Sequence, residues 1–96
     1  MENTIDEKRQ VWYKAFSLMT PSQCRAARAL LDWTQSDLAR SAEVGEVTLR
    51  QFENGVTEPR RAILRAFRDA LERGGVRFIE PNKGGGPGVR LREGGR

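Results

Sequence analysis

Apolar residues recur at helical spacing over much of the chain, and the clearest example lies between residues 60 and 73. Its apolar side chains stand at positions i, i+4, i+7 and i+8, with arginines between them; they are Ile63, Leu64, Phe67, Ala70 and Leu71. This stripe is typical of an amphipathic helix that packs one face against a core. Pro59 is expected to open the helix, and Gly74 with Gly75 to end it.

Start signals predict two shorter helices earlier in the chain. Thr20 is a suitable N-cap and the proline after it suits a first helical position, which predicts a helix over residues 21–32. Thr34 precedes a second helix, residues 35–42, and Asp37 stands in the capping-box position. The pattern breaks after residue 42, and a third helix is expected beyond this break, over residues 46–54.

Glycines mark both ends of that third helix. Gly45 either turns the chain or caps the start of the helix, whereas Asn54 and Gly55 end it because both tolerate the left-handed conformation. Two short helices joined by a tight, glycine-containing turn, with one helix before and one after, are the order of a helix-turn-helix domain. In that motif the second helix enters the major groove of DNA. Ala39 and Leu49 supply the small and apolar residues that close packing of the two helices needs.

The two ends of the chain have patterns of their own. Residues 5–19 form a helical pattern. The predicted helix either contacts another molecule, which is a partner or a second copy of the chain, or packs on its own domain. Near the other end, residues 76–79 and 89–92 predict two strands of a β-hairpin, joined by a connection rich in glycine and proline. A lone hairpin is marginal in water, so these strands need the helices or the same strands of a second subunit.

Composition excludes several classes of protein. The 96 residues contain one cysteine and no histidine, which excludes a disulfide framework, a histidine general base and a His-ligated metal site. The chain has no Gly-rich phosphate loop after a strand and no metal-ligand cluster, so we expect neither an enzyme nor a cofactor. No apolar run approaches the roughly 18 residues of a membrane span, and the first residues do not resemble a signal peptide. A cytoplasmic protein without a membrane partner is therefore expected.

The basic residues are skewed in type and in position. Fourteen of the 17 are arginines, whose planar fork suits phosphates and base edges. Residues 21–59 nevertheless carry four arginines and six acids, whereas residues 60–79 carry six arginines and two acids. Affinity for an anionic partner must therefore come mainly from the segment that follows the predicted motif.

Three sequence elements together resemble the phage lambda-repressor-like helix-turn-helix family, also called the Xre or Cro family. They are the stretch TQSDLA from Thr34, then Glu53-Asn54-Gly55, then Pro59, and the resemblance covers about residues 22–72. It implies a mainly α fold of four or five helices, to which this chain adds an N-terminal helix and a short C-terminal β-hairpin. Residues 1–19 are then an extension, 20–74 the DNA-binding domain, and 75–96 a hairpin and tail that are a candidate dimerisation element. Members of the family are mostly dimeric transcription regulators, often repressors.

The resemblance also implies roles for individual residues. Contacts to DNA bases are expected from Glu46, Val47, Arg50 and Gln51. Contacts to phosphates are expected from Gln35, Thr48, Arg60 and Arg61. Arg28 and Glu53 occupy positions that often form an ion pair linking the first and third helices, which is a structural role.

The chemistry of the base-contacting side chains agrees with these roles. Gln51 suits adenine, Arg50 suits guanine or a phosphate, and Val47 suits a thymine methyl group. Glu46 can accept from cytosine N4, but its charge also repels phosphates and departs from the neutral residues common there. For Gln35, the alternative to a phosphate contact is that it only helps to cap its helix.

The function predicted from the sequence is a repressor that binds double-stranded DNA as a homodimer. Because each subunit makes few phosphate contacts, a dimer that reads two half-sites roughly 34–36 Å apart is expected. The C-terminal strands and the helix at residues 60–73 are the candidates for its interface. The alternative is an antitoxin-like or antiactivator-like module that keeps the fold and binds a protein partner through residues 1–19.

Overall fold

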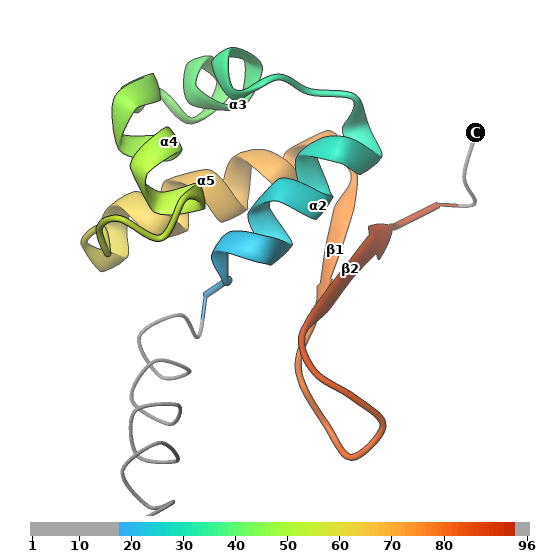
Figure 1. Ribbon diagram of the computed structural model, residues 1–96. Coiled ribbons are helices and arrows are strands. Elements are labelled where there is room, and N and C mark those ends of the chain that lie inside the picture. Colours follow the sequence, from blue (N-terminus) through green and yellow to red (C-terminus); the bar gives the residue numbers. More distant parts are fainter. Residues whose placement is uncertain (1–17, 94–96) are drawn as a thin grey trace, which may run out of the picture.

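The computed structural model describes residues 18–93, and within this range four helices precede one two-stranded sheet (Figure 1). The elements are α2 (Pro21–Leu31), α3 (Gln35–Ala42), α4 (Glu46–Glu53), α5 (Arg61–Gly74), β1 (Val76–Ile79) and β2 (Gly88–Leu91). The expected fold class, mainly helical with a short C-terminal hairpin, is confirmed. Among residues 18–93, no helix is both long and apolar enough to cross a membrane.

Capping boxes begin the first two of these helices. The Thr20 side chain accepts from the Gln23 backbone N–H, and the Gln23 side chain accepts from the Thr20 N–H in return. Thr34 and Asp37 make the same reciprocal pair at the start of α3. Each box satisfies two backbone donors that a helix N-terminus leaves without partners. The predicted caps at Thr20 and Thr34 are therefore confirmed.

Several predicted boundaries are wrong by about one residue. The helices predicted over residues 21–32 and 46–54 end at Leu31 and Glu53, and two predicted starts also differ. Pro59 does not open α5, because Ile63 and Leu64 both donate to the Arg60 carbonyl, which makes Arg60 the N-cap. The second strand runs over Gly88–Leu91 rather than residues 89–92, since Gly88 already pairs with Ile79. In both cases the exact start depends on which backbone groups meet in the folded chain.

The predicted N-terminal helix at 5–19 falls largely outside the described residues. Its last two positions are described, and they are not helical. Leu18 and Met19 instead join the hydrophobic core, where they are 6% and 1% exposed. The helical spacing of Met19 therefore reflects a core contact of the domain.

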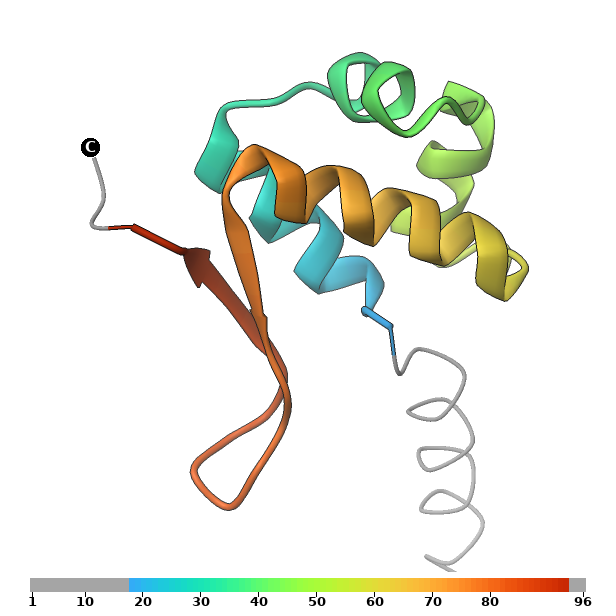
Figure 2. The same ribbon diagram turned by 180° about the vertical axis from the view of Figure 1, so that it is seen from behind.

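The core lies between α5 and the helices packed against it. Figure 2 shows α5 spanning one side of the molecule, with α3 and α2 beside it. Phe52 of α4 and Phe67 of α5 stack with ring centroids 6.4 Å apart, and both are fully buried. The amphipathic stripe of residues 60–73 thus contributes Leu64, Phe67, Ala70 and Leu71 to the core.

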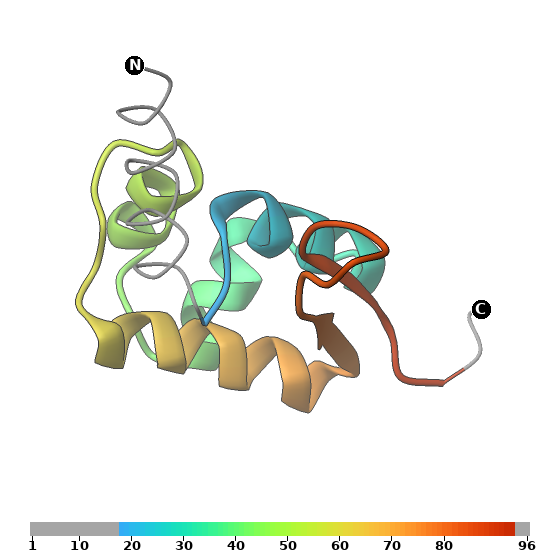
Figure 3. The same ribbon diagram turned by 90° about the horizontal axis from the view of Figure 1, so that it is seen from below.

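The hairpin packs against helices of its own chain. β1 and β2 are antiparallel and contact α2 and α5, and Gln23 Nε2 donates to the Gly88 carbonyl at 2.9 Å. The register places Arg77 opposite Arg90, and both are exposed. Figures 1 and 3 place the hairpin and α4 at opposite ends of α5.

Arg68 ties the N-terminal end of the described chain and the region of β1 to α5. Its guanidinium donates to the Leu18 carbonyl, pairs with Glu72 at 3.1 Å and Glu80 at 3.7 Å, and lies 4.7 Å from the centre of the Phe78 ring. The structure gives it a largely buried position, with 17% of its side chain exposed.

Gly74 offers a direct test of the packing where α5 ends. A Cβ at this position would lie 2.9 Å from atoms of Leu31 and of the Trp33 ring. We expect Gly74→Ala to destabilise the fold by about 1–3 kcal/mol in urea unfolding followed by circular dichroism. Gly85→Ala is the control, because nothing lies within 4 Å of its added Cβ. A more stable Gly74→Ala variant, as helix propensity alone would give, would contradict this packing.

Candidate nucleic-acid interface

The turn between α3 and α4 is made by Glu43 rather than by Gly45. Glu43 takes the left-handed conformation with φ 60°, whereas Gly45 is extended with φ −62° and is the N-cap of α4. Of the two roles that the sequence left open for Gly45, the structure therefore shows the cap. The two helices pack through Leu38, Ala39 and Leu49, all of which are buried.

A buried carboxylate connects α4 to both helices before it. Arg28 of α2 donates to Glu53 through Nε and Nη2, each at 2.8 Å, so the ion pair is bidentate. Gln35 of α3 donates to the same carboxylate at 2.9 Å, and the Cys24 thiol donates at 3.2 Å. Glu53 is 1% exposed, and its carboxylate is therefore satisfied inside the protein. We call these four residues the Glu53 cluster.

Charge and burial act in opposite directions on Glu53. Burial alone would raise its pKa, but the hydrogen bonds from Arg28, Gln35 and Cys24 outweigh it and hold the pKa below the ordinary value of 4.5. Burial and the neighbouring carboxylate raise the pKa of the Cys24 thiol. Cys24 is thus a neutral core residue, as expected when no base is present to activate it.

Gln35 makes a side-chain contact, with Glu53, that the sequence did not indicate. Its side chain belongs to the Glu53 cluster, and it is half-buried at the start of α3. This contact uses one of the two N–H groups of its amide. The predicted phosphate contact of Gln35 stays a prediction, for which the second N–H and the helix N-terminus are the available donors.

The side of α4 that faces away from the buried Leu49 and Phe52 is exposed. Val47 is 55% exposed, Arg50 and Gln51 are also exposed, and Thr48 is half-buried beside them. Glu46 accepts from the Ser36 hydroxyl of α3 at 2.7 Å, and its other oxygen lies 4.0 Å from Nη1 of Arg50. The predicted base-contacting residues thus share one side of α4, and Ser36 joins them.

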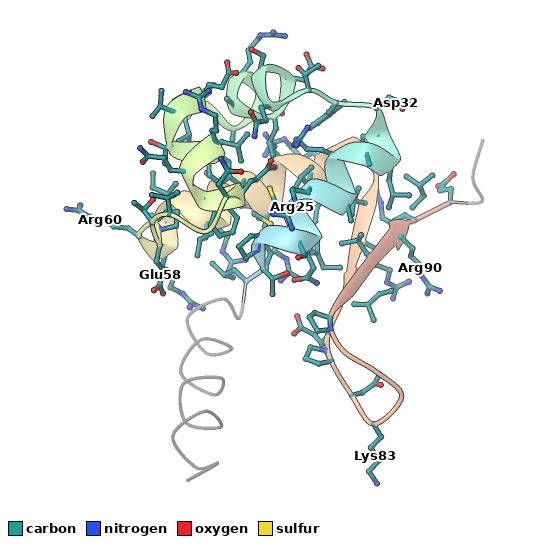
Figure 4. The ribbon with its side chains drawn as sticks, viewed as in Figure 1. Arg25, Asp32, Glu58, Arg60, Lys83 and Arg90 are labelled. Carbon is teal, nitrogen blue, oxygen red and sulfur yellow. The ribbon has the colours of Figure 1, made fainter. Side chains whose placement is uncertain are left out.

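Basic residues lie beside α4 on two segments. Arg60 and Arg61 are exposed at the N-terminus of α5, and Figure 4 shows Arg60 pointing outward with Glu58 next to it. Arg25 of α2 donates to the Glu53 carbonyl and to the Ser22 hydroxyl. Arg25 is not among the contacts predicted from the sequence, because its place beside the end of α4 depends on how α2 packs against α4. Figure 4 shows Arg90 and Lys83 well away from this region.

The described part of the chain has no group of three or more Cys, Asp or Glu side chains arranged to hold a metal ion. The arrangement instead offers neutral and cationic hydrogen-bond donors on one helix face, with cations beside it. Such a surface suits base edges and phosphates.

Comparison with known proteins gives one family. A family model described as helix-turn-helix matches residues 25–75, which is just over half of the chain. This region begins at Arg25 and ends at the glycines after α5, so it contains the whole of the Glu53 cluster except Cys24. No curated protein matches the chain.

The Glu53 cluster predicts a specific loss of stability. Glu53→Gln leaves the charge of Arg28 without its counterion, and we expect a cost of about 2–4 kcal/mol at pH 7, since Arg28 is not fully buried. Urea unfolding measures this cost, and Glu58→Gln, which removes an exposed carboxylate, is the control. Equal stability of Glu53→Gln and the natural chain would contradict the proposed role of the cluster.

The lowered pKa of Glu53 predicts a loss of stability in acid. Because the folded pKa lies below the unfolded one, ionised Glu53 stabilises the fold above pH 4.5, and this contribution disappears as the pH falls through the folded value. Urea midpoints measured at falling pH should therefore decline less steeply for Glu53→Gln than for the natural chain. If the urea midpoints of the two chains fall in parallel with pH, ionisation of Glu53 does not contribute to the loss of stability in acid.

Proposed function

Because the chain belongs to the lambda-repressor-like helix-turn-helix family of DNA-binding regulators, we propose that it is a dimeric repressor that reads a two-fold-related operator with α4. The family is not typically enzymatic. The observation that carries the proposal is the exposed side of α4, which presents Val47, Arg50 and Gln51 while the buried Glu53 anchors the C-terminal end of the helix.

The side chains on this face fit the chemistry of the major groove. Gln51 can pair with N6 and N7 of adenine, Arg50 with O6 and N7 of guanine, and Val47 can contact a thymine methyl group. All three stand on one short helix that the Glu53 cluster fixes in orientation. We therefore assign base reading to α4.

Phosphate contacts hold this helix in register on the duplex. We assign them to Arg60 and Arg61 at the start of α5, to Thr48, and to Gln35 at the N-terminus of α3. A helix N-terminus attracts anions through its free N–H groups and its dipole. Arg25 is added to this set, because it is exposed beside the end of α4.

Two copies are needed for tight binding. Each phosphate neutralised adds a slope of about −0.9 in log K against log salt, and the few cations beside α4 limit that contribution per subunit. We propose that the hairpin and α5 form the contact between copies, as β2 is an edge strand of a two-stranded sheet and lies far from α4. The two copies of α4 would then meet successive major grooves, roughly 34–36 Å apart.

Binding to the DNA upstream of the chain's own gene tests base reading. In a gel shift with excess competitor DNA, we expect a discrete complex whose affinity falls about 5- to 100-fold in Arg50→Ala and in Gln51→Ala. Arg40→Ala removes the same charge from a side chain of α3 that is 74% exposed and belongs neither to the proposed DNA contacts nor to the proposed contact between copies, and it is expected to bind as the natural chain does. If all three variants lose affinity to the same extent, or if no complex forms at all, the result would contradict the proposal and favour the protein-binding alternative.

Light scattering after gel filtration tests the dimer. The mass of one chain is 10.8 kDa, and the proposal requires a particle of twice that mass, free or on DNA. A particle that remains a single chain on its DNA would rule out the two-fold arrangement and leave base reading by one α4 at a time.

A further inference from the structure

Glu46 is an unexpected residue on a helix that approaches DNA. Its carboxylate stands at the first position of α4, on the same exposed side as Arg50, where a negative charge repels phosphates. The structure gives this carboxylate two partners. The Ser36 hydroxyl of α3 donates to one oxygen at 2.7 Å, and the other oxygen lies 4.0 Å from Nη1 of Arg50.

The stability of the fold does not account for this arrangement. The side chains of Arg50 and Glu46 are 47% and 43% exposed, and an exposed pair of this spacing contributes little to stability. An acid in the first turn of a helix adds only a small further gain through the helix dipole. A neutral residue would serve the fold nearly as well, without repelling DNA.

On the basis of the proposed function, we infer that Ser36, Glu46 and Arg50 act as one unit that reads a guanine. Ser36 fixes the Glu46 carboxylate by a hydrogen bond, and that carboxylate, 4.0 Å from Nη1, attracts the Arg50 guanidinium and biases it toward one range of orientations. A guanidinium has five N–H donors, and a bidentate contact to O6 and N7 of guanine uses only two of them. The ion pair and the guanine contact therefore do not compete. Arg50 is the reading residue, and Ser36 and Glu46 are positioning residues.

The carboxylate also selects the kind of partner that Arg50 takes. A free arginine on this face would bind the nearest phosphate, because two opposite charges attract at any angle. Beside Glu46 the charge of the pair is nearly cancelled, and the carboxylate repels phosphate oxygens. The neutral acceptor pair of a guanine edge is then the better match, and its geometry fits the planar fork of arginine. Glu46 thus lowers affinity for DNA in general and raises preference for guanine.

The test uses the tightest duplex that the full chain selects from random sequences. One guanine in each half-site is replaced by 7-deazaguanine, which lacks the N7 acceptor but still pairs with cytosine. We expect this replacement to weaken binding of the natural chain about tenfold at one position per half-site. In Arg50→Ala, which has no donor for N7, the same replacement should have little effect.

Variants of the positioning residues separate their role from a structural one. In Glu46→Gln we expect the 7-deazaguanine effect to shrink below about threefold, while affinity for random DNA rises because a negative charge is gone. Ser36→Ala should shift both quantities in the same direction by a smaller amount. Glu58→Gln is the matched control: it removes the same charge from the exposed loop after α4 and should leave the 7-deazaguanine effect unchanged. Thermal unfolding by circular dichroism verifies that each variant folds.

The outcomes distinguish this inference from the function on which it rests. If no duplex is selected, the proposed function itself fails. If a duplex is selected, but no guanine replacement has an effect on binding that depends on Arg50, base reading stands and the guanine assignment is wrong. If the effect depends on Arg50 and is equally large in Glu46→Gln, then Ser36 and Glu46 do not position Arg50, and the unit is overturned.

Discussion

The carboxylate of Glu53 determines where α4 stands. An eight-residue helix is not stable alone in water, so α4 (Glu46–Glu53) takes its orientation from contacts with the rest of the chain. Phe52 and Leu49 supply the apolar contacts, but apolar packing alone permits some sliding and rotation. The bidentate pair with Arg28 and the hydrogen bond from Gln35 remove that freedom, because each has a directional geometry. The exposed face of α4 is thereby held at a fixed angle to α2 and α3.

The charges of the interface favour discrimination over affinity. The region that contains α2, α3 and α4 carries more acids than arginines, and the cations that attract phosphates follow it at Arg60 and Arg61. On α4 itself the charges of Glu46 and Arg50 nearly cancel. Such a surface binds random DNA weakly, so its preference for one sequence must come from fixed hydrogen-bond geometry. That requirement gives the Glu53 cluster its importance, since a loosely held helix would lose the geometry.

Much of the fold followed from local signals in the sequence. The caps at Thr20 and Thr34, the stripe through Phe67 and the glycines after α5 each act within a few residues, and each predicted an element that the structure contains. The residues that we propose for base contacts came from the resemblance of the motif. What the sequence could not supply were long-range contacts of flexible polar side chains. The anchoring of Gln35 to Glu53, the links made by Arg68, and the Ser36–Glu46 bond depend on which helices meet, and no local spacing encodes that.

We propose that the rigidly held α4 lies in the major groove while the hairpin stays clear of the DNA. Backbone amide chemical shifts of the full chain, followed during titration with its selected duplex, test this arrangement directly. We expect large shifts at the N-termini of α3 and α4 and at Arg60, with smaller changes in β1 and β2. Large shifts confined to the hairpin, with α4 unaffected, would show that α4 does not contact the duplex.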